Sequence, residues 1–430
     1  MRSERGKMFA SLAVRNYRLF FAGALISNLG TWVQRVGQDW LVLTELTEGS
    51  SAALGIVTAL QFLAIPILAP YAGAVVDRMP KRRVLFATQV LLGVTAFALW
   101  GVVAAGVVEL WHVYLFAFLQ GVITAFDNPA RQSFVSEIVP PQLLPNAVGL
   151  NSTSFNGARL IGPGSAGLLI AAFGVGPTLL INAVSFVFML AAVVALRPAE
   201  LHPSRRVKAR GATRDGLRYL AGRPDLIILM VIVFALGTFG MNFQIYNALM
   251  ATEVFGKGAE EYGLLGTVMA VGTLGAALAA TRRTRPSLRT VLTALAAFAA
   301  STALLAVTPS YPVYALLLVP AGFFALTVMT TANAAVQLGT APQFRGRVMA
   351  VYVAIFTGGT PIGAPLIGWL GEVWGPRAMV LTGALATGLA AGAVLAYLML
   401  HDGVRLAVER GWPVRLRVFV AHREAAGVAD

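Results

Sequence analysis

The chain carries a series of apolar windows, each about as long as a helix that crosses a lipid bilayer. A hydrocarbon core about 30 Å thick requires roughly 20 apolar residues in a helix. We place such windows near residues 17–43, 52–76, 84–106, 112–134, 147–172, 176–197, 225–250, 262–281, 290–308, 313–337, 347–371 and 378–400. The pattern predicts an all-α polytopic membrane protein with twelve transmembrane helices.

The composition agrees with a chain that exposes most of its surface to lipid. Only 12% of the 430 residues are charged and 57% are hydrophobic, whereas a soluble domain carries roughly 25% charged residues. The net charge of +14 does not indicate a nucleic-acid-binding protein, because the basic residues lie in short clusters between the windows. The chain has no cysteine, which excludes disulfides, thiolate metal sites and cysteine nucleophiles.

The basic residues are distributed unevenly between alternate loops. All but four of the 33 Lys and Arg residues lie near the two termini or in the loops on one side, including the loop at 78–83. The loops on the other side hold only Lys257 and Arg377, and Arg35 and Arg159 fall inside predicted spans. Because cytoplasmic loops carry the excess of Lys and Arg, we expect both termini to be cytoplasmic.

The windows divide into two groups of six, which a basic segment separates. An internal repeat supports this division. Residues 140–169 resemble residues 341–370, and the two segments share a Pro-Gln pair and two glycines at a constant offset. Halves related in this way hold their substrate site between them, near the middle of the membrane. We expect an N-terminal bundle at 1–200, a cytoplasmic linker at 201–224, a C-terminal bundle at 225–400 and a cytoplasmic tail at 401–430.

A dense basic motif, GAVVDRMPKRR at residues 73–83, lies between the second and third windows. The bias toward positive cytoplasmic loops accounts for its cations, but not for the glycine, the aspartate or their spacing. The motif resembles the signature loop of the major facilitator superfamily. The resemblance implies two pseudo-symmetric six-helix bundles and a loop that stabilises the outward-facing state. The gating loop that it implies consists of Gly73, Asp77, Arg78, Lys81, Arg82 and Arg83.

The fifth window resembles the antiporter signature of drug exporters in that superfamily, with alanine at two of its glycine positions. In relatives this signature is associated with export. The alternative is structural, because small residues allow close helix packing and a proline bends the helix. The matching residues are Gly149, Gly162, Pro163 and Gly167.

Nearly the whole chain resembles one branch of drug:proton antiporters, which includes macrolide-efflux-like and enterobactin-exporter-like proteins. The resemblance implies a transporter and not an enzyme, with no cofactor and no metal. One feature departs from the pattern: Ala117 stands three residues before Gln120-Gly121, where relatives carry an arginine implicated in proton transfer. The route of proton coupling therefore stays open.

Polar residues on the first window mark it as a candidate wall of the transport pathway. They fall within an arc of about 140° on an otherwise apolar helix. Arg35 and Asp39 are four residues apart and can pair. The alternative to a pathway wall is a structural role, in which the two residues form an ion pair near the outer end of the helix and the polar face packs against a neighbouring helix. The candidates here are Asn28, Thr31, Arg35, Gln38 and Asp39, together with Ser27 and Gln34.

The fourth and fifth windows carry further polar candidates. A charged side chain at the centre of a bilayer costs about 2.5–3.5 kcal/mol, so Arg159 needs an anionic partner or carbonyl oxygens. Asp39 and Asp127 are the acids within the windows, and we expect one or both to carry protons; Asp127 could instead anchor its helix beside Pro129. The candidates here are Gln120, Thr124 and Asp127, with Arg131, and then Asn151 and Arg159.

The sequence favours a secondary active exporter that moves small amphipathic molecules, such as drugs, natural products or siderophores, out of the cell in exchange for protons. A flippase for lysophospholipid or another amphiphile is the alternative, and a nutrient importer is a third. The expected partners are the substrate, protons and the lipid bilayer, with no nucleic acid, and the expected state is a monomer. Arginine outnumbers lysine, and alanine and glycine are abundant, which indicates a prokaryote and hence its plasma (inner) membrane.

Overall fold

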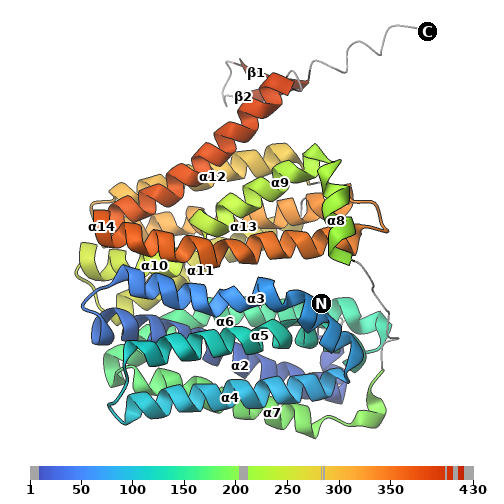
Figure 1. Ribbon diagram of the computed structural model, residues 1–430, viewed down its shortest axis with the longest axis vertical. Coiled ribbons are helices and arrows are strands. Elements are labelled where there is room, and N and C mark those ends of the chain that lie inside the picture. The colour runs from blue at the N-terminus through green and yellow to red at the C-terminus, as the bar shows by residue number, and fades with distance from the viewer. Residues whose placement is uncertain are drawn as a thin grey trace, which may run out of the picture.

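The computed structural model describes residues 9–202, 212–281, 283, 286–401, 404–409 and 415–420. The expected linker at 201–224 and tail at 401–430 lie partly outside these residues. The described chain is mainly helical, as the apolar windows predict, and its helices form two layers (Figure 1).

The N-terminal half forms the lower layer in Figure 1. Short 3-10 turns lie at Ala10–Ala13 (η1), Pro141–Leu143 (η3) and Pro198–Glu200 (η4), and a π-helical segment at Leu41–Leu46 (η2) continues the first long helix. The long helices are α2 (Arg15–Trp40), α3 (Ser51–Arg78), α4 (Lys81–Ala104), α5 (Leu110–Ile138), α6 (Leu144–Phe173) and α7 (Gly176–Ala195).

The C-terminal half forms the upper layer, and a small antiparallel hairpin of β1 (Val404–Glu409) and β2 (Arg415–Val420) follows it. One π-helical segment, η5 (Leu236–Gly240), interrupts the seventh window, and a second, η6 (Met250–Val254), lies at its end. The helices are α8 (Ala212–Ala221), α9 (Pro224–Ala235), α10 (Phe243–Leu249), α11 (Ala259–Thr281), α12 (Leu288–Val307), α13 (Tyr311–Gly339) and α14 (Arg345–His401).

Nine helical segments in the described residues are long and apolar enough to cross a membrane. Two of the expected windows, those of α2 and α6, are not among them, because both helices carry many polar residues. The last two windows form two helices that meet at the non-helical Gly375, where φ is +83°, and the label α14 covers both. The polytopic helical fold is confirmed, while the number twelve stays a prediction.

The seventh window, expected near 225–250, is not one continuous helix. It breaks between Leu236 and Asn242, where Gly237 lies so close to α14 that an added Cβ would sit 2.8 Å from the carbonyl oxygen of Phe356. The amide of Asn242 donates a hydrogen bond to the carbonyl oxygen of Thr238 over 2.8 Å, which satisfies one backbone acceptor at the break.

Helices α3 and α14, and helices α6 and α11, form the main contacts between the two halves. We call the end with residues 47–50 and 255–258 the acidic end, and the end with residues 79–80 and 139–143 the basic end. Near the acidic end, Ser51 Oγ donates to the carbonyl oxygen of Gly368 over 2.7 Å, and the Ala52 N–H donates to Glu372 Oε2 over 3.0 Å.

Glycines permit this close approach between the halves. A Cβ on Gly167 would lie 2.5 Å from the carbonyl oxygen of Ala259, and one on Gly55 would collide with the backbone of Ala364. Toward the basic end the same two helices are open: a Cβ on Gly73 of α3 or Gly149 of α6 would meet nothing within 4 Å. The halves therefore touch near the acidic end and separate toward the basic end.

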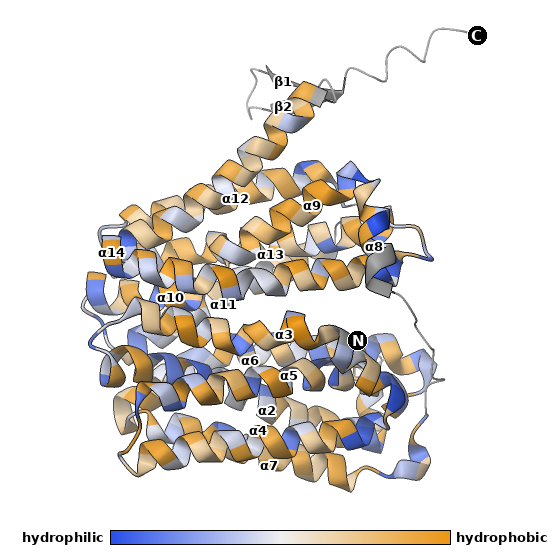
Figure 2. Ribbon diagram, viewed as in Figure 1, coloured by the Kyte–Doolittle hydropathy of each residue, from blue (hydrophilic) through white to orange (hydrophobic). Residues whose placement is uncertain are grey.

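Hydrophilic residues gather toward the two ends of the helices, and apolar residues cover their length (Figure 2). Large apolar side chains are exposed along the outer helices; Leu316 is 70% exposed and Leu389 is 72% exposed. An exposed apolar belt of this kind is compatible with a surrounding bilayer.

The chain contains no cysteine, so a single introduced thiol can test the predicted orientation. Val107→Cys at the acidic end and Met79→Cys at the basic end both replace exposed side chains. In intact cells, a membrane-impermeant maleimide should label Val107→Cys and should leave Met79→Cys unlabelled until the membrane is broken. The reverse labelling pattern would overturn the predicted topology.

Candidate transport site

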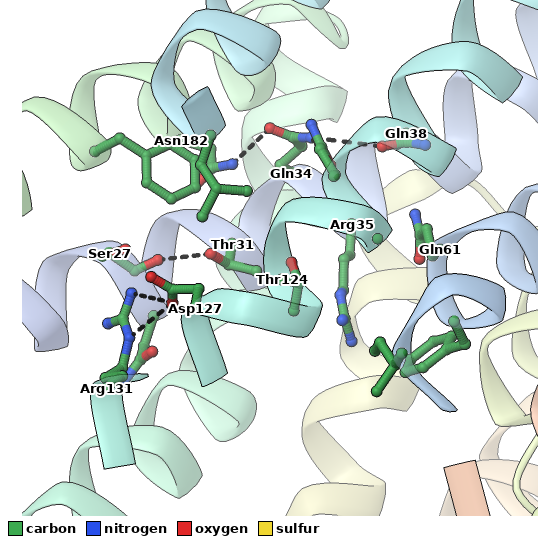
Figure 3. A pocket seen from close by; sticks show the side chains of 17 residues that line it. Ser27, Thr31, Gln34, Arg35, Gln38, Gln61, Thr124, Asp127, Arg131 and Asn182 are labelled. Carbon is green, nitrogen blue, oxygen red and sulfur yellow. Dashed lines mark hydrogen bonds and ion pairs between the residues drawn. The ribbon is translucent and has the colours of Figure 1, made fainter. Parts of the chain in front are cut away.

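A polar cavity of about 120 Å³ lies inside the N-terminal half, between α2, α3, α4, α5 and α7. The polar faces predicted on the first and fourth windows converge on it. The predicted candidates among its lining residues are Ser27, Asn28, Thr31, Gln34, Arg35, Gln38, Gln120, Thr124, Asp127 and Arg131. Asp39, Asn151 and Arg159 lie outside the lining. In Figure 3, Asp127 and Arg131 lie together on one side of the view and Gln61 lies on the other side, with Arg35 between them.

Side-chain amides form a continuous network along one wall of the cavity (Figure 3). The amide of Asn182 donates to Gln34 Oε1 over 2.5 Å. Gln34 Nε2 in turn donates to Gln120 Oε1 over 3.2 Å and, more weakly, to Gln38 Oε1 over 3.5 Å. Within the described residues, Nε2 of Gln38 and Nε2 of Gln120 are buried with no acceptor. This wall of the cavity therefore presents free N–H donors.

Asp127 is buried and fully engaged by neighbours within its own half. Its Oδ1 accepts hydrogen bonds of 2.7 Å from both Thr88 and Gln89 of α4. Its Oδ2 accepts from Nε of Arg131, one helical turn away, over 3.1 Å. The arrangement ties α4 to α5, as the anchoring interpretation of Asp127 requires.

Asp39 does not form the expected ion pair with Arg35. Within the described residues no ion pair joins them, and Asp39 Oδ2 instead accepts from Gln244 Nε2 of α10 over 3.1 Å and from the Tyr262 hydroxyl of α11 over 3.0 Å. We call these three residues the Asp39 bridge. It connects the last turn of α2 with the other half of the protein, and Trp40 stacks on the Tyr262 ring with centroids 6.3 Å apart. The physical reason is that two neutral donors from the other half lie within hydrogen-bond distance of the buried carboxylate, where the halves meet.

Arg35 and Arg159 both contact the ring of Trp32 instead of a carboxylate. The guanidinium carbon of Arg35 lies 5.1 Å from the centre of this ring, and that of Arg159 lies 5.7 Å from it. Arg35 also lies 5.5 Å from the ring centre of Phe62. The face of an aromatic ring attracts a cation through its quadrupole. We call Arg35, Arg159 and Trp32 the arginine pair site.

The remaining polar candidates form local contacts. Asn28 donates to Ser154 Oγ over 3.3 Å, which joins α2 to α6. The hydroxyl of Thr31 donates to the carbonyl oxygen of Ser27 over 2.8 Å within the same helix. Asn151 Oδ1 lies 3.4 Å from the Tyr17 hydroxyl, at the limit of a hydrogen bond.

The gating loop is tethered mainly to its own half. Lys81 forms an ion pair of 2.7 Å with Glu137 of α5, and Arg82 donates to the carbonyl oxygens of Val193 and Val194 at the end of α7 over 3.1 and 2.9 Å. Asp77, Arg78 and Arg83 are exposed at the basic end. Within the described residues, Asp77 therefore forms no hydrogen bond or ion pair with the other half. The role of the loop in the outward-facing state remains a prediction.

The antiporter-like residues lie largely at helix contacts. A Cβ on Gly162 would come within 2.5 Å of Trp32 Cβ. Pro163 and Gly167 pack against α11, where the close partner is Gly263. Gly149 faces open space, as described above. Close packing thus explains three of the four positions.

Several residues of the site had no clear sequence signal. Thr88 and Gln89, the partners of Asp127, and Tyr262, a partner of Asp39, are single polar or aromatic residues in otherwise apolar windows. Trp32 also resembles an ordinary apolar side chain in the sequence. Its position between Thr31 and Arg35 on a polar helix is the one signal that could have marked it as a site residue. No group of three or more metal-ligating side chains occurs in the described part of the chain.

A two-layered helical membrane fold with a polar internal cavity is typical of a small-molecule transporter. A family model described as "Transmembrane secretion effector" matches residues 6–416. The chain belongs to this family of major facilitator transporters.

Curated relatives are similar to the chain at low identity. A "Staphyloferrin A transporter" of Staphylococcus aureus is 26% identical over 275 residues, which is 61% of this chain and 66% of that protein. The chain thus spans slightly less than two thirds of that relative. A "Multidrug efflux pump Tap" of Mycolicibacterium fortuitum is 27% identical over 377 residues, or 84% of this chain and 91% of the relative. A "Macrolide efflux protein A" of Streptococcus pyogenes is 26% identical over 153 residues, 36% of each chain.

Solved transporter structures share the fold. A bacterial homologue of the human lysosomal transporter Spinster, in an inward-facing and unoccupied conformation, aligns with a TM-score of 0.65 at 16% identity over 90% of this chain and 94% of that one. A D-xylose-proton symporter aligns with a TM-score of 0.67 at 14% identity over 89% of this chain and 97% of that one. At these identities the likeness shows the major facilitator fold alone, which confirms the predicted fold class.

Removal of the Asp127 charge should destabilise the protein. Asp127→Asn keeps the size of the side chain but leaves Arg131 without its carboxylate, and the loss of one partner of a buried pair costs about 3–5 kcal/mol. We expect a clearly lower thermal midpoint for the purified protein in detergent. Asp77→Asn, the same change at an exposed position, is the control and should leave the midpoint unchanged. Equal midpoints for the two variants would contradict the anchoring role.

Proposed function

We propose that the protein is a secondary active exporter that moves small amphipathic molecules out of the cell by alternating access, in exchange for protons. Its family and the names of its relatives support export, because those relatives are a siderophore transporter, a multidrug efflux pump and a macrolide efflux protein. We place it in the plasma membrane of a prokaryote with both termini in the cytoplasm, because Lys and Arg gather at the basic end.

The contacts between the halves support alternating access. If the basic end faces the cytoplasm, closure at the acidic end and separation at the basic end correspond to an inward-open state. Rocking of the two halves around the cavity would then close the basic end and open the acidic end. In that state the gating loop, whose Asp77 is exposed here, would reach the other half.

The Asp39 bridge is the observation that carries the proposal of proton exchange. An ionised carboxylate accepts hydrogen bonds from Gln244 and Tyr262 more strongly than its protonated form does. The ionised form therefore holds the acidic end closed. An empty carrier that has released its proton to the cytoplasm stays inward-open and waits for substrate, which is what an exchanger requires in order not to leak protons.

Asp39→Asn should uncouple export from the proton gradient. In inside-out vesicles with an acidic interior, the wild-type protein should accumulate ethidium or erythromycin, and an ideal one-proton exchange gives about tenfold accumulation for each pH unit. In Asp39→Asn the gradient should no longer increase the accumulation, because the residue cannot ionise. Tyr262→Phe should weaken the response without abolishing it, since Gln244 still donates.

Glu48→Gln is the matched control, because Glu48 is an exposed acid at the same end of the protein. It should respond to the gradient like the wild type. A full gradient response in Asp39→Asn would remove this residue from proton exchange.

A flippase for lysophospholipid is the second candidate, and one observation favours it. An apolar cavity of about 430 Å³ lies against α2, α6 and α7, where Leu29, Leu169 and Phe188 form part of its wall. Such a surface can accept an acyl chain. Movement of fluorescent lysophosphatidylethanolamine between leaflets without a pH gradient, in vesicles that fail to accumulate either drug, would favour the flippase over the exporter.

A further inference from the structure

Two arginine side chains from different helices share one tryptophan in the N-terminal half. Arg35 of α2 and Arg159 of α6 both lie within 6 Å of the Trp32 ring centre, at 5.1 and 5.7 Å. The two guanidinium groups are near enough to repel each other. A pair of like charges in a membrane protein is unfavourable unless negative groups, carbonyl oxygens or water compensate it.

The described residues supply too little negative charge for this pair. Neither arginine takes part in an ion pair or a side-chain hydrogen bond within that part of the chain. Asp39 attracts Arg35 through space, but its hydrogen bonds go to Gln244 and Tyr262. Asp127 is neutralised by Arg131. The arginine pair site therefore carries a net positive charge.

The surroundings of Arg35 add hydrogen-bond donors of the same kind. Gln38 is 1% exposed, and its Nε2 has no acceptor among the described residues. Gln120 Nε2 is in the same situation on the facing helix. Each of these glutamines accepts from Gln34 through its Oε1, which fixes the amide so that the donor stays free. A ligand here would have to bring acceptors, and a carboxylate is an acceptor without donors.

Aromatic rings give the site an apolar side. Phe155 meets the Trp32 ring edge to face with centroids 6.2 Å apart, and it is 49% exposed. Phe62 lies beside Arg35 on α3. Gly162 allows Trp32 to lie against α6, because any larger residue would collide with Trp32 Cβ. The glycine of the antiporter-like motif thus brings the two arginines to one ring.

We infer that Arg35 and Arg159, held against Trp32, bind the carboxylate of a small organic acid whose apolar part packs on the neighbouring aromatic rings. The inference rests on the proposed function, since it names the substrate class of that exporter. It narrows the class from amphipathic molecules in general to amphipathic anions.

Paired acids and amides test this directly. The purified full-length chain in phosphatidylcholine nanodiscs is titrated with three carboxylic acids and their neutral amides, built on indole, phenyl and octyl groups; indole-3-acetate and indole-3-acetamide are the first pair. An acid should bind about tenfold more tightly than its amide, because only the acid offers a charged acceptor. Arg35→Gln and Arg159→Gln should each reduce this preference, and the double variant should remove it while the affinity for the amide stays within about twofold.

Two further variants separate charge from structure. Arg159→Lys keeps a cation and should retain most of the preference, which a merely structural loss would not allow. Arg218→Gln removes one exposed positive charge elsewhere and should change nothing. If no acid binds more tightly than its amide, or if the double variant keeps the preference, the inference is wrong.

The same titration in a second lipid shows whether the bound anion is a small molecule or a lipid phosphate. The protein should bind the acids with the same affinity in nanodiscs that contain phosphatidylglycerol and in nanodiscs of phosphatidylcholine alone. Loss of acid binding in the anionic lipid would assign the site to a lipid phosphate and overturn the small-molecule inference. The titration requires neither a gradient nor transport, so its failure is distinct from a failure of the proposed exporter.

Discussion

The acidic end of this protein depends on one ionisable group that the two halves share, the carboxylate of Asp39. Hydrocarbon does not solvate a charge, so a carboxylate at this depth must find donors within the protein. Asp127 finds them within its own half, from Thr88, Gln89 and Arg131. Asp39 accepts hydrogen bonds from the other half, from Gln244 and Tyr262. The same physical requirement thus stabilises one bundle in the first case and joins two bundles in the second.

The rest of the architecture makes such a shared group effective. Glycines bring α3 against α14 and α6 against α11 near the acidic end. The hydrogen bonds of Asp39 therefore lie beside closely packed helices of the two halves. Toward the basic end the helices separate, and the exposed Asp77 is free to act in another arrangement. The N-terminal half holds the polar cavity, the amide network and both membrane arginines. The charged groups within the helices are therefore concentrated in the N-terminal half, and the other half supplies the neutral partners of Asp39.

Hydropathy was enough to predict the helical fold, since burial in a bilayer imposes long apolar windows. It also indicated the polar faces of the first and fourth windows, which meet at the cavity. Arg35 and Asp39 can meet on one helix, but no ion pair joins them in the described residues, because a spacing of four residues shows only which side chains are able to meet. Gln244 and Tyr262 are 205 and 223 residues away from Asp39, and no local pattern reports such a contact. The break in the seventh helix was also not predicted; it lies where Gly237 packs closely against Phe356 of α14.

Distance measurement across the acidic end tests the role of Asp39 most directly. The chain has no native cysteine, so spin labels can be placed at Glu48→Cys and Val373→Cys, two exposed positions on opposite halves. At high pH we expect one short distance, because the ionised carboxylate holds the halves together. At low pH a longer distance should appear, and Asp39→Asn should show it at both pH values. A single short distance in the variant and in the wild-type protein at every pH would contradict the account.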